Sequence, residues 1–153
     1  LPPAYATGQT YNDPTFTARF PDGWTVGDDG EGRPKLLAPS WAGVTLAVAD
    51  APGRQIDEYA DQIFGQVKGW AEEGGRFELL CRDKITIGQY PGYRFRFIHN
   101  RFDTADGKPV PEQINRVFFL ANGRSYNANG FMEPGDPILA TIEAITASYT
   151  PKP

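Results

Sequence analysis

The chain has 153 residues, of which 40% are hydrophobic and 13% aromatic, enough for one domain with one sizeable core. Its net charge of -4 and pI of about 5.0 argue against nucleic acid as a partner, because phosphate binding needs a concentrated basic face. No apolar run reaches the length of about 18 residues that a membrane span needs, so no transmembrane segment is predicted. The one cysteine, Cys81, excludes an internal disulfide.

The N-terminal segment lacks any apolar periodicity and begins at Leu1 rather than at a methionine. We therefore expect residues 1–11 to form a flexible tether of the kind that follows a signal peptide or a lipid anchor, and residues 12–150 to form a single domain. This predicts an extracytoplasmic protein (periplasmic, cell-surface or secreted), with a lipid anchor in a missing leader as one option.

The first third of the chain predicts short antiparallel strands. Phe16–Phe20 is followed by Pro21-Asp22-Gly23, a turn sequence, and a return strand begins at Trp24. Further strands are expected at 35–38 and 44–50. In the last of these, one face is apolar and the other carries only Thr45, Ala47 and Ala49.

A long amphipathic helix is expected over residues 55–73. Its apolar stripe recurs at three- and four-residue steps and comprises Ile56, Tyr59, Ala60, Ile63, Phe64, Val67 and Trp70. Gly74-Gly75 marks its end. Because a helix with one apolar stripe must cover a flat apolar surface, we expect it to pack on a sheet, with Trp70 in the core.

The second half of the chain predicts more strands and a closing helix. The expected strands are 77–80, 84–87, 93–102, 112–120 and 125–131. Asn122-Gly123 predicts a tight hairpin turn, and Asp136-Pro137 predicts the start of the last helix, whose buried side would include Ile142 and Tyr149. The expected fold class is α+β: an antiparallel β-sheet with helices packed on it, an α/β/α sandwich.

This order of elements resembles the PsbP/Mog-like superfamily. The motifs that carry the resemblance are Phe20-Pro21-Asp22-Gly23-Trp24, the helix Ile56–Trp70, the strand entry Gly88–Tyr93, and the closing Ser148-Tyr149. The resemblance implies non-enzymatic work. PsbP proteins attach to the lumenal side of photosystem II, Mog proteins bind a Ran-type GTPase, and many bacterial relatives are exported proteins, lipoproteins or secretion adaptors. The N-terminal segment shows no counterpart of the photosystem docking residues, and nothing in the sequence indicates a GTPase partner.

Three arginines on the long strands are candidate binding residues. Arg94 and Arg96 share a strand face, and Arg116 joins them if the two strands pair in the matching register. Three guanidinium groups on one face would receive a carboxylate or a phosphate. The alternative is that they pair with acidic residues of a covering helix or line a solvated face.

His99, the only histidine, is a candidate ligand or base beside Arg101. The alternative is a hydrogen-bonded strand-end residue packed near Phe97, because no carboxylate or cysteine cluster adjoins His99 in the sequence. Cys81, next to Arg82, would be either a reactive thiol or a small buried strand residue.

Trp41 is the aromatic residue most suited to a partner contact, because it sits in a turn between strands. Exposed, it would be a hot-spot candidate; folded back, it would cover the sheet edge. Trp24 is expected in the core. The acidic, glycine-rich loops at 27–32 and 103–107 lack the spacing of calcium or phosphate loops. We therefore predict no metal site, no cofactor and no catalytic residue.

Three functions follow from these patterns. The first is a non-catalytic, exported binding or adaptor protein that contacts another protein of the cell envelope. The second is a binding module for a small anionic or sugar-like ligand held between sheet and helix. The third, most remote, is a hydrolase that uses His99 with Cys81 or a carboxylate.

Overall fold

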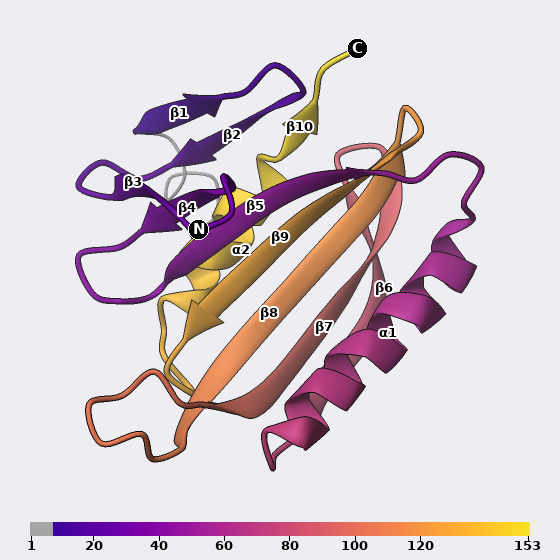
Figure 1. The fold of residues 1–153 in the computed structure, drawn as a ribbon. Helices are drawn as coiled ribbons and strands as arrows, with labels where there is room; N and C mark the ends of the chain where they lie inside the picture. The colour runs from indigo at the N-terminus through magenta and orange to yellow at the C-terminus, as the bar shows by residue number, and fades with distance from the viewer. Residues whose placement is uncertain (1–7) are drawn as a thin grey trace.

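A computed structural model describes residues 8–153 (Figure 1). Residues 1–7 of the expected tether lie outside the described residues. Residues 9–11, also expected in the tether, belong instead to a strand, Gln9–Asn12, so the expected boundary between residues 11 and 12 falls inside it. This strand pairs with Phe16–Phe20 in a hairpin, although its own residues show no apolar pattern that would predict a strand.

The described residues form ten strands and two helices. The strands are β1 (Gln9–Asn12), β2 (Phe16–Phe20), β3 (Thr25–Asp28), β4 (Pro34–Leu37), β5 (Gly43–Asp50), β6 (Glu78–Ile87), β7 (Tyr90–Arg101), β8 (Val110–Ala121), β9 (Arg124–Met132) and β10 (Thr150–Pro151); the helices are α1 (Ile56–Glu73) and α2 (Leu139–Ala147).

The main sheet has seven antiparallel strands in the order β3-β4-β5-β9-β8-β7-β6, and its two longest strands, β8 and β7, are neighbours in its interior. Asn122 and Gly123 both have positive φ, of 54° and 74°, and close the β8–β9 hairpin as predicted. A smaller sheet of three strands, in the order β1-β2-β10, is separate.

Helices cover the two faces of the main sheet unequally (Figure 1). On one face, α2 and the small sheet enclose a core that includes Phe16, Leu46, Tyr126 and Ile142. On the other face, α1 packs through Ala60, Ile63, Val67 and Ala71 onto the aromatic residues of β7 and β8. The result is the expected α+β sandwich of antiparallel sheet and helices.

Several strand ends differ from prediction by one to three residues, and two elements differ in kind. The strands expected at 77–80 and 84–87 are one strand, β6, because a β-bulge between Leu79 and Cys81 interrupts the alternation without ending the pairing with β7. The last helix begins at Leu139 rather than at Asp136-Pro137, since Asp136 accepts a hydrogen bond from the Ile138 N–H within a turn that precedes the helix.

Helix α2 lies close to β9 because the strand carries a glycine beneath it. A Cβ atom on Gly130 would lie 2.6 Å from Cγ2 of Ile142, a residue with no exposed surface. The strand therefore needs a residue without a side chain at this point.

Candidate functional site

The main sheet separates the three candidate arginines. β8 pairs with β7 so that Arg116 lies opposite Phe95, whereas Arg96 lies opposite Asn115. Paired residues share a face, so Arg116 faces the α1 side, while Arg94 and Arg96 face the α2 side. The expected cluster of three guanidinium groups on one face is therefore wrong, because the register places Arg116 on the opposite face.

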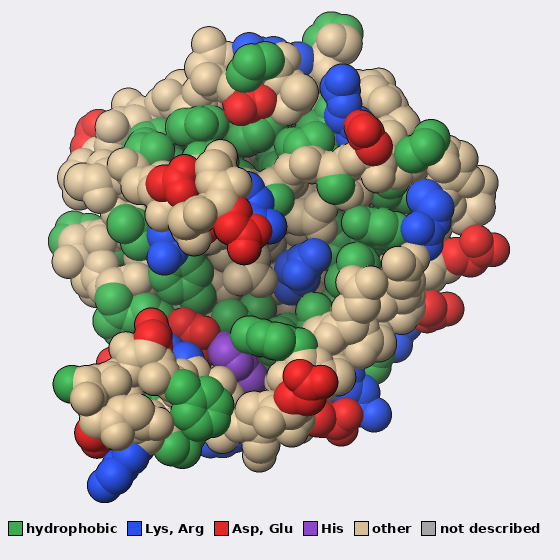
Figure 2. All heavy atoms as spheres, viewed as in Figure 1, with side chains coloured by type: hydrophobic (Ala, Val, Ile, Leu, Met, Phe, Trp, Pro, Cys, Tyr) green, Lys and Arg blue, Asp and Glu red, His purple; other side chains and the backbone are tan. Residues whose placement is uncertain are grey.

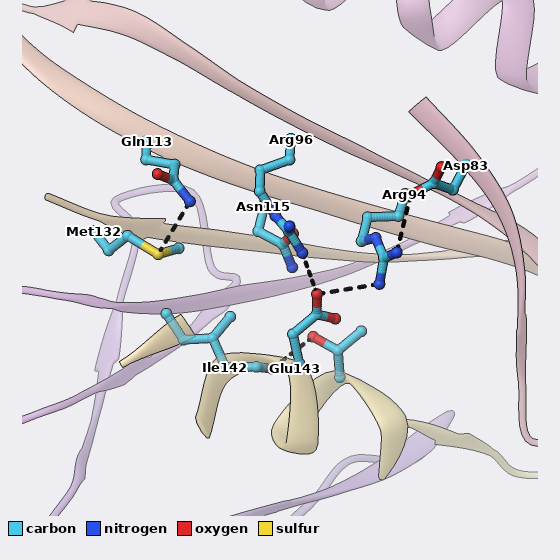
Figure 3. Close-up of polar contacts among 9 residues, drawn as sticks. Asp83, Arg94, Arg96, Gln113, Asn115, Met132, Ile142 and Glu143 are labelled. Carbon is cyan, nitrogen blue, oxygen red and sulfur yellow. Dashed lines mark hydrogen bonds and ion pairs between the residues drawn. The ribbon is translucent and has the colours of Figure 1, made fainter. Parts of the chain in front are cut away.

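Arg94 and Arg96 are held by carboxylates of the chain itself (Figure 3). Glu143 of α2 accepts hydrogen bonds from Arg96 at 2.5 Å and from Arg94 at 3.2 Å. Arg94 also donates to Asp83 at 2.9 Å, and hydrogen bonds from Arg94 and then from Cys81 lower the pKa of Asp83. These contacts match the alternative in which the pair is bound by a covering helix, here α2.

The α1 side of the sheet is only partly covered. Between α1, the β3–β4 hairpin and the loop that holds Trp41, two adjoining hollows of about 560 and 640 Å³ share Asp29, Thr45, Trp70 and Asn129, and so form one continuous groove. Figure 2 shows this hollow with basic side chains within it. Its size suits a small ligand or a short peptide segment.

Arg116 lies in the floor of this groove, on the central strand β8. Its guanidinium donates one hydrogen bond, to Oδ1 of Asn127 at 3.1 Å, and its buried Nε has no partner. No carboxylate within residues 8–153 forms an ion pair with it. Burial of the guanidinium lowers the pKa of Arg116, yet arginine stays charged at neutral pH. The groove thus holds a largely desolvated cation without a counterion among the residues that the structure describes.

The groove carboxylates, in contrast, all have cationic or histidine partners. Asp29 pairs with Arg33 at 2.5 Å and Asp103 with Arg101 at 2.9 Å. Among the described lining residues, Arg116 and Lys35 are the two cations without an ion pair, and the Lys35 ammonium lies 5.3 Å from the ring centre of Phe131. The groove therefore favours an anionic group, although the whole chain is acidic.

Two tryptophans form the rim of the groove. Trp41 is 37% exposed, stacks on Phe131 with ring centres 6.1 Å apart, and has the Arg101 guanidinium 4.7 Å from its ring centre. Trp70, expected in the core, is 55% exposed, so that prediction is wrong. It lies near the end of α1 on the flank that also holds Tyr59 and Gln66, past the buried stripe.

His99 lies buried beneath Trp70, with the two ring centres 4.3 Å apart. Its Nε2 lies 2.7 Å from Oε1 of Glu112, the residue opposite it on β8. Sequence reasoning missed this carboxylate because the two residues meet only through strand pairing. The position matches the alternative of a hydrogen-bonded, packed histidine.

Cys81 is half-buried on the α2 side of the sheet, opposite Arg96 on β7. The sheet therefore lies between Cys81 and His99. In the described part of the chain, no three His, Cys, Asp or Glu side chains gather as a metal site would require. Neither described helix combines the length and apolar composition of a membrane span.

Sequence reasoning also missed the polar floor of the groove. Asn127 and Asn129 alternate along β9 with the buried Tyr126 and Ala128. This period-two pattern indicates a strand with one polar face, and the small side chains of Thr45, Ala47 and Ala49 on the neighbouring β5 line the same groove.

Comparison with known proteins gives the class of fold. No protein-family model matches the chain, and no curated protein does. The solution structure of cyanobacterial PsbP (CyanoP) from Synechocystis sp. PCC 6803 is similar over 94% of this chain and 92% of that one, with a TM-score of 0.67 and 12% identity. A crystal structure from Bacteroides thetaiotaomicron VPI-5482 is similar over 96% of this chain but 49% of that one, with a TM-score of 0.61 and 12% identity. The chain thus has a PsbP-like fold, as the motifs indicated, and at this identity the likeness concerns the fold alone.

Proposed function

We propose that the protein is a non-catalytic binding protein whose binding surface is the groove between α1 and the uncovered half of the main sheet. The observation that supports this most directly is the combination of an unpaired guanidinium in the floor, Arg116, with two exposed tryptophans at the rim. Tryptophan and arginine are among the residue types that dominate binding energy at interfaces.

The arrangement argues against a hydrolase built on His99 and Cys81. The sheet lies between the two side chains, and the His99 ring is buried against Glu112 and Trp70. A general base must come within hydrogen-bond reach of the group that it deprotonates, and these two cannot meet without unpairing β6 from β7.

The occupant that we favour is a segment of another protein, which makes this protein an adaptor, and its site of action lies outside the cytoplasm. The resemblance to exported relatives supports this location. A second candidate occupant is a small anionic or sugar-like compound, which the unpaired cation in the groove floor favours.

Site-specific photo-cross-linking tests the proposal. A photoreactive phenylalanine replaces Trp41 or Trp70 in the full-length protein, expressed in its own cells and irradiated there. The matched control carries the same probe at Ala147, an exposed residue of α2 on the opposite side of the sheet. We expect one discrete adduct from both rim positions and none from Ala147. The captured protein, once purified, should bind at least tenfold more weakly to a Trp70→Ala variant. Equal labelling from all three positions would contradict the proposal.

A further inference from the structure

The side chains around Arg116 fix its direction. Oδ1 of Asn127 accepts the hydrogen bond from Arg116, while the Asn127 amide nitrogen donates to the Ser125 hydroxyl at 3.1 Å. Asn127 is thus held from both ends, and the guanidinium is held by a rigid strand rather than by a loop. A group supported in this way presents its remaining N–H donors in a constant direction.

The neighbouring groove residues offer further hydrogen-bond donors. The Thr45 hydroxyl, the Tyr59 hydroxyl and the Asn129 amide line the same part of the groove, and none is engaged in a side-chain hydrogen bond with the described residues. Each can donate to an oxygen atom of a bound group. One cation and several neutral donors match an oxyanion better than a neutral ligand.

The charge and the apolar surroundings indicate which oxyanion. The other unpaired cation, Lys35, lines only the adjoining hollow, so Arg116 is the one unpaired cation of this hollow among the described residues. One guanidinium balances one negative charge, as on a carboxylate, whereas phosphate carries more than one at neutral pH. Val67, Trp70 and Phe97 line the same hollow, so the group attached to the carboxylate would rest on apolar and aromatic surface. An aromatic acid fits these conditions, as does the free C-terminus of a partner chain that ends in an apolar residue.

We infer that Arg116 is the anchor of a carboxylate-binding subsite in the groove floor, with Asn127 as the residue that positions its guanidinium. The inference rests on the proposed function, because it assigns the chemical group that the groove receives. The carboxylate belongs either to a small aromatic acid or to the C-terminus of a partner chain, and the test separates these two sources.

The test uses the full-length ¹⁵N-labelled protein at pH 7 and follows its arginine Nε–H signals by NMR. Phenylacetate is titrated against phenylacetamide, which has a closely similar shape and no charge. The tripeptide Gly-Gly-Phe with a free C-terminus is titrated against its amide. Arg116→Met removes the anchor, and Arg76→Met is the matched control, because Arg76 forms an exposed ion pair with Glu78 away from the groove.

We expect phenylacetate to shift, saturably, the Nε–H signal that is missing from Arg116→Met, and to bind about tenfold or more tightly than its amide, as a charge-assisted hydrogen bond implies. This preference should fall to about twofold or less in Arg116→Met, on the same reasoning, and persist in Arg76→Met. Tighter binding of the tripeptide acid would assign the carboxylate to a partner chain; equal or weaker binding would assign it to a small acid.

Equal binding of acid and amide to the wild-type protein would overturn the inference without requiring any variant to fold. An acid preference that survives in Arg116→Met would also overturn it. In both cases a rim-specific cross-link from Trp41 and Trp70 would leave the proposed binding function standing, so the two failures are distinguishable.

Discussion

Replacing Arg96 with methionine should destabilise the fold, whereas the same replacement at Arg116 should not. Glu143 would lose its 2.5 Å contact and keep only the longer one to Arg94, and Oδ1 of Asn115 would lose its 3.2 Å donor. Opposite charges whose centres lie about 4 Å apart attract by about 4 kcal/mol in an effective dielectric of about 20. About a quarter of each side chain is exposed, with 22% for Arg96 and 28% for Glu143, so solvent reduces this value. We expect a net loss of about 1–3 kcal/mol.

Arg116 differs because its removal leaves no carboxylate without a partner. The Arg116→Met variant loses one hydrogen bond to Asn127 and also relieves the desolvation of a partly buried charge. These effects oppose each other, so its unfolding free energy should stay within about 1 kcal/mol of the wild type. The assay is urea unfolding at pH 7, followed by far-UV circular dichroism, with thermal midpoints as a second measure. For a domain of this size, the Arg96 variant should melt about 3–10 °C lower. An equal loss in both variants would refute the reasoning that Arg116 lacks a structural partner.

Three further predictions concern packing, acid sensitivity and the rim. Gly130→Ala should cost about 1–3 kcal/mol in urea unfolding, because its new Cβ would lie 2.6 Å from a buried Ile142 atom, whereas Gly65→Ala on open helix surface should be neutral or stabilising. Hydrogen bonds from Lys84 and then Tyr93 lower the pKa of Asp57, so this carboxylate contributes stability above its ordinary pKa of 3.8, and the contribution is lost as the pH falls through its lower folded pKa. Asp57→Asn should therefore flatten the curve of unfolding free energy against pH between about pH 5 and pH 2, and an unchanged curve would contradict this. Trp70→Ala should change thermal stability by less than about 1 kcal/mol because the side chain is 55% exposed, and a larger loss would place it in the core after all.

The elements that local pattern determines were predictable from the sequence. The apolar stripe of α1, the Phe16–Phe20 strand and the Asn122-Gly123 turn occur as expected, because each depends on residues that are close together in the sequence. The strands β1 and β10 were not predicted, since they are short and owe their conformation to pairing with β2 rather than to their own side chains.

The candidate site was less predictable because it depends on the register of strand pairing and on how much of the main sheet α1 covers. A shift of one residue in the pairing of β7 with β8 would have placed Arg116 beside Arg94 and Arg96. The apolar stripe of α1 indicated that Trp70 faces the sheet, but it did not indicate where the part of the sheet covered by α1 ends. His99 and Glu112 are 13 residues apart in the sequence and meet only across the strands.

The partners of the arginines on β7 and β8 distinguish the two faces of the main sheet. On the α2 side, Arg94 and Arg96 share the carboxylate of Glu143 on the covering helix, and this contact binds two layers of the fold together. On the α1 side, Arg116 donates one hydrogen bond, to the neutral side chain of Asn127, and has no counterion among the described residues. A desolvated, uncompensated charge is unfavourable for folding alone. We therefore infer that its counter-charge comes from outside the chain, and that the half of the sheet left uncovered by α1 is where it arrives.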